Sequence, residues 1–591
     1  MPTHFYSLSR IALVFCCAVQ LYLGAFYYPK WQRNWTEASI SHDAAGYYLY
    51  LPAVFIYHDL KRCAFADEIV KKYQPVSSFS TDVELPNGNY IMKYSCGQAI
   101  MVSPAFFAAH AYCLIAGGYP ADGFSRPYQF AFWAWCLLLA WLGLWGLRVV
   151  MLHYFSDGVV ALTLVSIALC TNYLDYSAIS NGLTHSNLFT LYVGLLLATI
   201  RFYKRPNGYL ALAIGLLCGL AATTRPTEIM VTLIPIFWGV YDVNTLRKRF
   251  WFFVEQRVLT AFIMIGFLAV AMVQPLYWHY VSGSWLVYSY GQQGFDWLHP
   301  HYIKCLFHAN AGWLRYSPVI VFAFIGVLWL KRIQPALFPL VLMYGLLATY
   351  VCFAWSEWWY GWSLGQRAMV QSYPIWAFGF GGFYSSILKN RYLKWLVIFV
   401  FPVLLYYNAW CIYQSHTGGL LKGPEMNNAY FNAIVGRWHV ADETQLLLDH
   451  PDQAAAKFSG GQEIFSARML NDTLPGLNGR LVQGNEVLPL AQLKLQPNAR
   501  AYAISLRGTC TEQEWNNWLM AQLVVMLFSR DHKVDEQMIR INRVMPVQQP
   551  GEATMFVSNH AVSDSMAVQV YLPEGGKPVF IDGLRIRQQG F

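Results

Sequence analysis

The sequence predicts a polytopic α-helical membrane protein with a C-terminal β-sandwich domain. Of its 591 residues, 56% are hydrophobic and only 12% are charged, whereas a soluble domain carries about 25% charged residues. Apolar runs of about 20 residues, the length of a membrane helix, recur between residues 8 and 413. Beyond that point shorter, alternating runs replace them. We therefore expect a membrane domain at 1–413, a linker at 414–440 and a β-domain at 441–591.

The apolar segments of the membrane domain alternate with short basic clusters. The segments cover approximately 8–28, 98–116, 127–148, 157–176, 185–202, 208–224, 227–241, 258–279, 316–330, 335–354, 372–388 and 395–413. The basic clusters lie at 201–205, 247–257, 331–332 and 389–394. Because Lys and Arg are enriched in cytoplasmic loops, we expect all of these clusters to face the cytoplasm.

Segment 98–116 determines the side on which the first polar loop lies. If this segment spans the membrane, the loop shares the cytoplasmic side with the basic clusters. If it lies in the interface or re-enters, the whole region 29–126 is extracytoplasmic. Pro104, His110 and the Gly117-Gly118 end favour the second arrangement, because irregular backbone is tolerated where protein or water covers it. This prediction gives eleven membrane spans. The first apolar run, 11–28, has no small-residue cleavage site, so we expect it to be a retained anchor helix.

The composition argues against several other classes of protein. The net charge of +9 comes from short clusters between apolar runs, so it does not indicate a nucleic-acid-binding protein. The twelve cysteines form no CxxC pair, although Cys63 and Cys96 share one polar loop and their pairing is left open. His42, His58, His185, His299, His301 and His308 lack the spacing of metal ligands, so no obligatory metal or cofactor is expected.

The tail contains short alternating runs that are typical of strands. They lie at 501–506, 521–529, 538–544, 554–557, 566–572 and 579–586, with turn residues such as Pro550-Gly551 between them. This pattern predicts an antiparallel β-sandwich, which we expect on the extracytoplasmic side. The apolar run 519–528 is too short to span a membrane and is interpreted as a core strand.

Asp43 is the first residue that could carry chemistry. It lies at the start of an aromatic, apolar run that includes Tyr47, Tyr48 and Tyr50, residues suited to the headgroup zone of a membrane. A carboxylate there can serve as a general base, since it is ionised at neutral pH. It can equally be a helix N-cap in the sequence Ser41-His42-Asp43.

Two basic residues on the same outer face are candidates for binding a lipid phosphate. Lys93 precedes an apolar segment and lies outside, against the usual charge bias, although it can also be a snorkelling anchor. Arg225 precedes Pro226 between two apolar segments, and charge at such a depth is expensive and often functional. Glu228 begins the next helix, where it can assist the site or simply pair with Arg225.

The stretch 355–367, WSEWWYGWSLGQR, is the densest signal in the sequence. Its aromatic residues can form a stacking platform for a sugar ring, and Arg367 can bind a phosphate through two parallel hydrogen bonds. The candidate sugar-binding residues are Trp358, Trp359, Tyr360 and Trp362. His308, which precedes a similar Gly-Trp-Leu-Arg run, is a further candidate for binding the donor; an interfacial aromatic belt is the alternative for the tryptophans.

These motifs together resemble the GT-C superfamily of lipid-phosphate-dependent glycosyltransferases. The nearest members are bacterial relatives of protein O-mannosyltransferases and aminoarabinose transferases, in glycosyltransferase family 39. The resemblance covers residues 8–413 and rests on 43–47, DAAGY, on Lys93 before an apolar helix, on 123–126, GFSR, on 225–227, RPT, and on 358–367, WWYGWSLGQR. The chain departs from the family pattern at Ala44, where relatives carry an acidic residue, and at Tyr94-Ser95, where they carry Pro-Pro.

The resemblance implies an inverting membrane glycosyltransferase that takes one sugar from a polyprenyl-phosphate donor. Asp43 would accept the proton of the acceptor hydroxyl, and Lys93, Arg225 and Arg367 would neutralise the departing phosphate. The acceptor would be an envelope glycan, lipid or protein, and loop 280–315 would close over the site. The resemblance also implies a bacterial inner-membrane protein whose site and β-domain face the periplasm.

Two other functions fit the same features. A transporter or flippase for a lipid-linked sugar would bind the same ligand without chemistry, although such proteins often contain inverted repeats and none is visible here. An envelope scaffold or receptor built around the β-domain would need Arg225 and Arg367 only for stability.

Overall fold

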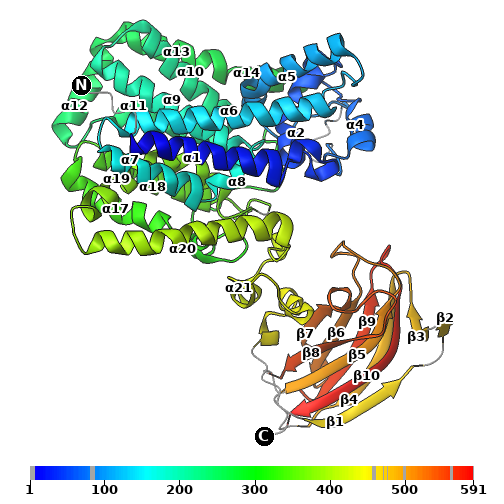
Figure 1. The fold of residues 1–591 in the computed structure, drawn as a ribbon. Helices are drawn as coiled ribbons and strands as arrows, with labels where there is room; N and C mark the ends of the chain where they lie inside the picture. Colours follow the sequence, from blue (N-terminus) through cyan, green and yellow to red (C-terminus); the bar gives the residue numbers. More distant parts are fainter. Residues whose placement is uncertain are drawn as a thin grey trace. The chain divides into compact units, whose positions relative to one another are not determined.

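The computed structural model describes residues 7–79, 85, 87–361, 363–454, 461–469, 472–474, 477–496, 501–559 and 563–589. Its chain forms two compact units, Met1–Thr417 and Gly418–Phe591 (Figure 1). The first unit is helical, and the second contains all the described strands. Cys63 and Cys96, whose pairing the sequence leaves open, are buried and are both free thiols.

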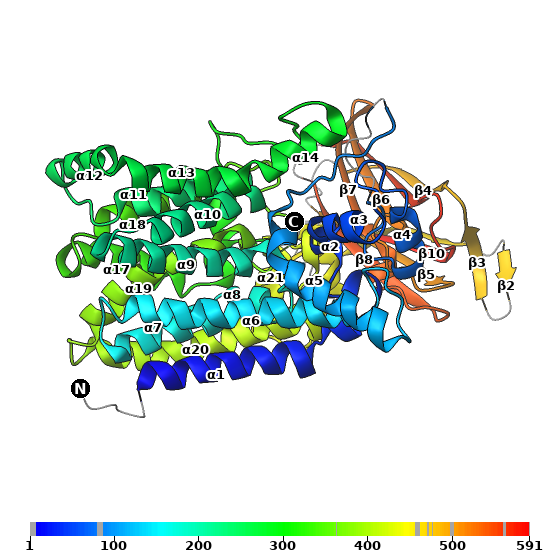
Figure 2. The ribbon, with the colours of Figure 1, turned by 90° about the horizontal axis from the view of Figure 1, so that it is seen from above.

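The first unit consists of helices that run approximately parallel or antiparallel to one another (Figure 2). Its first half contains α1 (Leu8–Tyr22), α2 (His42–Tyr48), α3 (Tyr50–Phe55), α4 (Ala66–Tyr73), α5 (Gly97–Ala116), α6 (Arg126–Met151), α7 (Asp157–Cys170), α8 (Tyr173–Ala178), α9 (Thr184–Lys204) and α10 (Gly208–Thr224). Its second half contains α11 (Leu233–Phe237), α12 (Val243–Glu255), α13 (Arg257–Ala271), α14 (Val273–Ser282), α15 (Tyr302–Phe307), α16 (Trp313–Tyr316), α17 (Ile320–Ile333), α18 (Phe338–Phe353), α19 (Tyr373–Ile387) and α20 (Leu393–Tyr413).

Six helical stretches among the described residues are long and apolar enough to cross a membrane. They are Leu8–Gln32, Gly97–Ala116, Arg126–Met151, Thr184–Lys204, Arg257–Ser282 and Leu393–Gly418. Shorter apolar helices cover Asp157–Cys170, Gly208–Thr224, Pro226–Phe237 and Phe338–Phe353. The predicted helical unit with several possible membrane helices is therefore confirmed, and the number of crossings stays a prediction.

Glycines let two pairs of helices approach to backbone contact. A Cβ atom on Gly215 of α10 would lie 2.0 Å from the carbonyl oxygen of Ile263 in α13. A Cβ atom on Gly326 of α17 would lie 1.8 Å from the carbonyl oxygen of Gly379 in α19. Small residues at such crossings are a known means of packing helices closely within membranes.

Helix α5 begins at the depth where α10 ends. A Cβ atom on Gly97 would lie 2.4 Å from the backbone nitrogen of Thr224, the last residue of α10. From there α5 runs antiparallel to the first part of α6: the Trp135 indole donates to the Met101 carbonyl (2.8 Å), and the His110 ring is 2.6 Å from the Tyr128 hydroxyl. Most of α5 therefore lies beyond the end of α10 rather than beside it.

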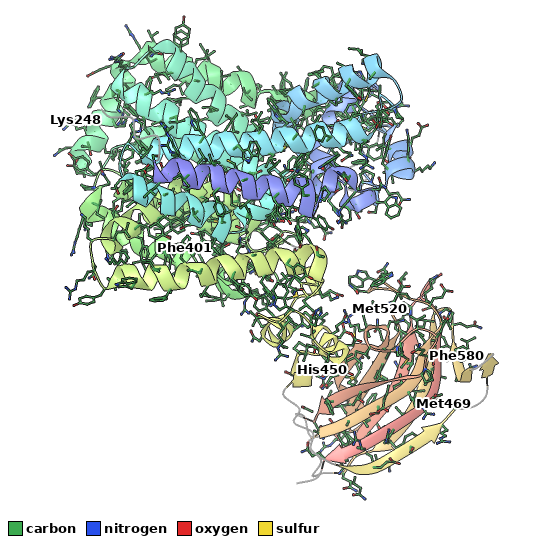
Figure 3. The ribbon with its side chains drawn as sticks, viewed as in Figure 1. Lys248, Phe401, His450, Met469, Met520 and Phe580 are labelled. Carbon is green, nitrogen blue, oxygen red and sulfur yellow. The ribbon has the colours of Figure 1, made fainter. Side chains whose placement is uncertain are left out.

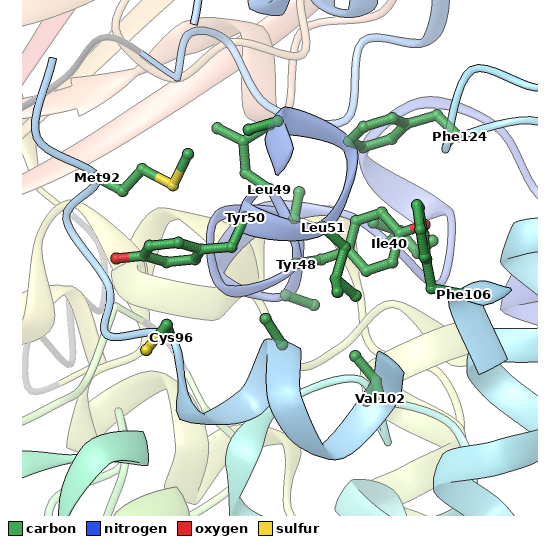
Figure 4. Close-up of a cluster of buried hydrophobic side chains, with 14 of the residues drawn as sticks. Ile40, Tyr48, Leu49, Tyr50, Leu51, Met92, Cys96, Val102, Phe106 and Phe124 are labelled. Atoms are coloured by element: carbon green, nitrogen blue, oxygen red, sulfur yellow. The ribbon is translucent and has the colours of Figure 1, made fainter. Parts of the chain in front are cut away.

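A hydrophobic cluster joins α2, α3 and α5 and holds the segment that carries Asp43. Figure 4 shows part of it, with Tyr48 and Leu51 on the side of Phe106 and Val102 of α5, and Leu49 directed away from that helix. The other labelled members are Ile40, Tyr50, Met92, Cys96 and Phe124. Burial of this many large side chains fixes α2 against the bundle, since a fully buried aliphatic or aromatic side chain contributes about 1.5–3 kcal/mol.

The second unit contains two antiparallel sheets that share one hydrophobic core. Its strands are β1 (Gln462–Arg468), β2 (Asp472–Leu474), β3 (Leu477–Val482), β4 (Glu486–Lys494), β5 (Ala501–Cys510), β6 (Gln522–Ser529), β7 (His532–Arg540), β8 (Gly551–Ser558), β9 (Ser565–Leu572) and β10 (Val579–Gln589). One sheet has the order β2-β3-β10-β5-β8, with β1 also paired to β10, and the other has the order β4-β9-β6-β7. The inward side chains of both sheets form one cluster. The antiparallel β-region predicted for the tail is thus confirmed.

The segment before the strands belongs to this second unit. Helix α21 (Asn428–Ile434) lies inside the range expected to be a linker. The Asp449 carboxylate, whose side chain is 1% exposed, accepts hydrogen bonds from Arg540 Nη1 (2.5 Å) and Arg543 Nε (2.9 Å). Arg543 also binds Glu425 (2.9 Å), so residues near α21 are tied to the sheet. His450, which follows Asp449 in the sequence, is labelled in Figure 3.

Candidate functional site

A cavity of about 450 Å³ in the first unit is lined by residues from widely separated segments. Asp43 comes from α2, Lys93 from the stretch before α5, Arg225 from the break between α10 and the 3-10 helix Pro226–Thr232, and Arg367 from the start of the 3-10 helix Arg367–Ser372. The sequence predicted that these four residues share a site, and the structure brings them together.

Asp43 does not cap its helix. Helix α2 begins at His42, and Ser41 occupies the N-cap position without a side-chain hydrogen bond. The Asp43 carboxylate instead accepts a hydrogen bond from the Tyr94 hydroxyl at Oδ1 (2.7 Å) and pairs with Arg367 Nη2 at Oδ2 (2.6 Å). The Asp43 side chain is 27% exposed and that of Arg367 is 16% exposed, so the pair is largely shielded from water.

These contacts keep Asp43 ionised. Burial acts to raise the pKa of Asp43, but the positive charge of Arg367 and the hydrogen bonds from Tyr94 and Arg367 together hold that pKa below the ordinary value of 3.8. Burial and the negative charge of Asp43 raise the pKa of Tyr94 above its ordinary value of 10, so this phenol keeps its proton and remains a donor. A carboxylate with two donors is available to accept a proton from a third group.

Tyr94 is a part of the site that the sequence did not indicate. Its ring packs on Gly46 of α2, where an added Cβ atom would lie 2.5 Å from the ring, and its centroid is 4.4 Å from that of Tyr47. The ring of Tyr290 meets it edge-on at 6.2 Å. Tyr94 is therefore held on several sides, with its hydroxyl directed at Asp43.

Arg225 lies on the cavity wall where Pro226 interrupts the helix. Its Nη1 atom is 3.3 Å from Nδ1 of His185, and its guanidinium carbon lies 5.8 Å from the centroid of the Tyr360 ring. Proline cannot donate a backbone hydrogen bond, so α10 ends at Thr224 and the arginine projects at its end. The alternative reading, an Arg225–Glu228 ion pair, is not the arrangement observed: the Glu228 carboxylate accepts hydrogen bonds from Tyr192 and Gln371.

Lys93 is positioned by the loop that follows α14. The Ser289 hydroxyl donates to the Lys93 carbonyl (2.6 Å), and the Lys93 ammonium lies 5.7 Å from the centroid of the Tyr290 ring. Residues 286–290 form part of the cavity wall, together with Gln293 and Phe295. This is the loop that the sequence suggested as a cover for the site.

The aromatic loop 355–367 contributes to the cavity in a different way from that predicted. Tyr360 lines it, with a positive φ of 52° and its hydroxyl donating to the Cys352 carbonyl (2.9 Å). Trp358 is buried away from the cavity against His308, with ring centroids 5.2 Å apart. Trp359 is likewise not on the cavity wall, and Trp362 lies outside the described residues.

Two further predicted site residues do not line the cavity, whereas two other residues of the aromatic loop do. Neither Glu228 nor His308 lines the cavity. Trp355 and Glu357, from the same aromatic loop, do line it, and the Trp355 ring meets Tyr290 edge-on at 5.5 Å. Within the part of the chain that the structure describes, no group of three His, Cys, Asp or Glu side chains is arranged to hold a metal ion.

The comparisons with known proteins do not identify a family. No family model matches the sequence, and no curated protein matches it. The resemblance to GT-C glycosyltransferases therefore stays a prediction that rests on the motifs and on the cavity they line.

Proposed function

We propose that this protein is a membrane glycosyltransferase of the GT-C type that moves one sugar from a polyprenyl-phosphate donor to an envelope acceptor. The observation that carries the proposal is the convergence of the Asp43 carboxylate and three cations, Lys93, Arg225 and Arg367, on one cavity. A volume of about 450 Å³ suits a small ligand, since ligand pockets commonly measure about 300–1,000 Å³.

The charges support the chemistry of transfer with inversion. The acceptor hydroxyl attacks the anomeric carbon while the bond from that carbon to the phosphate oxygen breaks. The electron pair leaves with the polyprenyl phosphate, and the hydroxyl proton passes to the Asp43 carboxylate. Lys93, Arg225 and Arg367 stabilise the negative charge that develops on the phosphate, and such fixed charge stabilisation is commonly the largest contribution to catalysis.

The Asp43–Arg367 ion pair couples binding of the polyprenyl-phosphate sugar to the basicity of Asp43. Arg367 Nη2 is engaged by Asp43, whereas its Nε is buried and, among the described residues, has no hydrogen-bond partner. A phosphate in the cavity, whose wall includes Arg367, would compete with Asp43 for the positive charge of the guanidinium. Binding of the donor would then weaken the hold of Arg367 on Asp43 and raise its basicity when the acceptor arrives.

Two features support an extracytoplasmic site and eleven membrane spans. Helix α9 starts at Thr184 on the cavity wall and ends about 30 Å away at the basic cluster 201–205, given a rise of 1.5 Å per residue. Lys248, on the basic helix α12, is exposed (Figure 3). If the basic clusters face the cytoplasm, the cavity faces outward and α5 lies at or beyond the outer membrane surface. We further propose that this membrane is the bacterial inner membrane.

The second unit offers a surface for the acceptor. The outer face of the sheet containing β1, β5, β8 and β10 carries a groove of about 260 Å³. Short side chains such as Ser466 and Ser505 lie among Arg468, Arg585 and Glu552. This mixture of donors and acceptors suits the hydroxyl groups of a glycan, and we propose that this β-domain recognises the acceptor.

Mass spectrometry of lipid that co-purifies with the full-length protein tests the function directly. A polyprenyl phosphate carrying one sugar is expected. Asp43→Asn should retain this lipid but slow transfer by about 10²–10⁴-fold, the usual effect of losing a general base. Asp67→Asn, which alters an exposed carboxylate in the same polar region, should transfer at the normal rate. Unchanged movement of the sugar across the membrane in Asp43→Asn, with no transfer by the wild type, would indicate a transporter instead.

A further inference from the structure

A chain of buried polar side chains leads from the cavity wall into the helical bundle. It begins at His185 of α9, passes through Gln371 and Glu228, and ends at Tyr192 and Tyr344. Each of these side chains is at most 4% exposed, and only His185 lines the cavity. A polar network at such a depth is costly unless each member is hydrogen-bonded, and in a membrane protein it marks a candidate functional element.

The direction of the hydrogen bonds follows from the chemistry of Glu228. Its carboxylate accepts a hydrogen bond from the Tyr192 hydroxyl at Oε2 and one from the Gln371 amide nitrogen at Oε1 (3.0 Å). Because Tyr192 uses its only proton on Glu228, Tyr344 must donate to Tyr192 in their mutual contact. Both oxygens of the Glu228 carboxylate thus accept hydrogen bonds.

The same logic fixes the proton on His185. When the Gln371 nitrogen faces Glu228, the Gln371 oxygen must face His185, and it lies 3.0 Å from Nδ1. An amide oxygen only accepts, so Nδ1 must carry the hydrogen. Arg225 Nη1 also directs a hydrogen at Nδ1, over the longer distance of 3.3 Å, and so competes for the same ring atom. The shorter contact with the Gln371 oxygen favours the hydrogen on Nδ1.

We propose that Glu228, acting through Gln371, holds His185 in the Nδ1–H tautomer so that its Nε2 atom accepts a hydrogen bond from a hydroxyl group of the sugar in the cavity. The cationic neighbour Arg225 disfavours a second positive charge on the ring, so His185 is neutral and Nε2 carries a lone pair. A phosphate at this site has only acceptor oxygens, and therefore the partner of Nε2 is a sugar hydroxyl. Glu228 and Gln371 are positioning residues. The identity of the ligand rests on the proposed function; the tautomer does not.

The tautomer can be measured without any substrate. Full-length protein labelled with ¹⁵N-histidine and solubilised in detergent gives ¹⁵N chemical shifts that distinguish Nδ1–H, Nε2–H and doubly protonated rings, and His185→Gln identifies the signal. The wild type should show Nδ1–H. In Glu228→Gln the new amide can donate to Gln371, turning the Gln371 amide over and moving the hydrogen of His185 to Nε2. Glu255→Gln makes the same change at an exposed position and should leave the signal unmoved.

Two results would overturn the proposal that Glu228 and Gln371 hold His185 in the Nδ1–H tautomer. One is a wild-type His185 that carries its hydrogen on Nε2 or is doubly protonated, and the other is a His185 signal that is the same in Glu228→Gln and in Glu255→Gln. Gln371→Leu provides a second route if Glu228→Gln fails to fold, because it removes the oxygen that holds Nδ1–H and should yield a mixture of tautomers.

The contact with the sugar has its own test. In lipid co-purified with His185→Phe, the ratio of sugar-bearing to bare polyprenyl phosphate should fall about threefold to tenfold relative to wild type, the expected effect of losing one neutral hydrogen bond. His185→Gln retains an acceptor and should restore much of the ratio. An unchanged ratio in His185→Phe would overturn the sugar contact. Absence of polyprenyl phosphate from the wild type would overturn the proposed function and this contact together. The tautomer measurement would still show whether Glu228 and Gln371 fix the hydrogen of His185 on Nδ1.

Discussion

Gly46→Ala tests whether the packing of Tyr94 is what places its hydroxyl against Asp43. The added methyl group would lie 2.5 Å from the Tyr94 ring, so the ring must move. Tyr47 and Tyr290 restrict that movement. Overpacking of this kind costs about 1–3 kcal/mol of unfolding free energy. Displacement of the ring also breaks the 2.7 Å hydrogen bond to the carboxylate, and a bond to a charged group contributes about 1.5–3 kcal/mol.

Thermal unfolding of the detergent-solubilised protein, combined with a double-mutant cycle, separates these two effects. Tyr94→Phe removes the hydrogen bond without the clash, so Gly46→Ala and Tyr94→Phe should be less than additive when combined. Gly158→Ala is a suitable control, since the nearest atom to its added methyl group lies at 3.9 Å and a helical alanine is favoured. Wild-type stability in Gly46→Ala, or full additivity with Tyr94→Phe, would refute the assigned role of the packing.

Three further changes test other parts of the structure. In Arg367→Gln the pKa of Asp43 should rise, because the arginine charge no longer opposes the effect of burial. In the wild type the lowered pKa of Asp43 stabilises the fold at pH values above the unfolded pKa near 3.8, and this stabilisation is lost as the pH falls through the folded pKa. The difference in unfolding free energy between the two proteins should therefore narrow on acidification below about pH 4. Gly215→Ala should lower the unfolding free energy by about 3 kcal/mol or more, because its methyl group would lie 2.0 Å from the Ile263 carbonyl oxygen and the helices must separate. Asp449→Asn should destabilise the second unit by about 3–5 kcal/mol, the cost of leaving buried arginines without their partner, as followed by limited proteolysis of that unit.

Each of these variants has a control at a comparable position. Arg62→Gln changes an exposed arginine and should leave the acid stability profile unaltered. Gly194→Ala introduces a methyl group with neighbours no closer than 3.8 Å and should cost little. Asp452→Asn alters an exposed carboxylate close to Asp449 in the sequence. Equal effects in a variant and its control would show that the contact in question is not responsible.

The charged residues of the cavity were predictable from the sequence because charge beside an apolar run is costly and therefore conspicuous. This holds for Asp43, Lys93, Arg225 and Arg367. Tyr94 could not be singled out, since the chain contains 39 tyrosines and nothing in the local pattern distinguishes the one that reaches a carboxylate. The same applies to polar residues of the buried network such as Gln371, whose partners are far away in the sequence.

Trp358 does not lie on the cavity wall, because the direction of a side chain in a turn depends on the backbone. Tyr360 and Gly361 both adopt positive φ angles, of 52° and 70°, and these reverse the chain so that Trp358 faces the interior while Tyr360 faces the cavity. Residue type alone carries no such information. Strand β4 was also missed, since Pro489 and the mixed polar sequence around it do not give a clear alternation.

Hydrogen bonds attach the loop 286–295 at two places, and the ring of Tyr290 also packs against Tyr94 and Trp355. Ser289 is bonded to the Lys93 carbonyl, and Phe295 pairs with Trp355 in a short antiparallel bridge. Displacing this loop to admit a ligand must therefore break both attachments, and it pulls on the aromatic loop at the same time. We therefore expect the loop to open in a single cooperative step whose rate depends on these two attachments. Weakening either attachment should shorten the time for which a ligand stays bound.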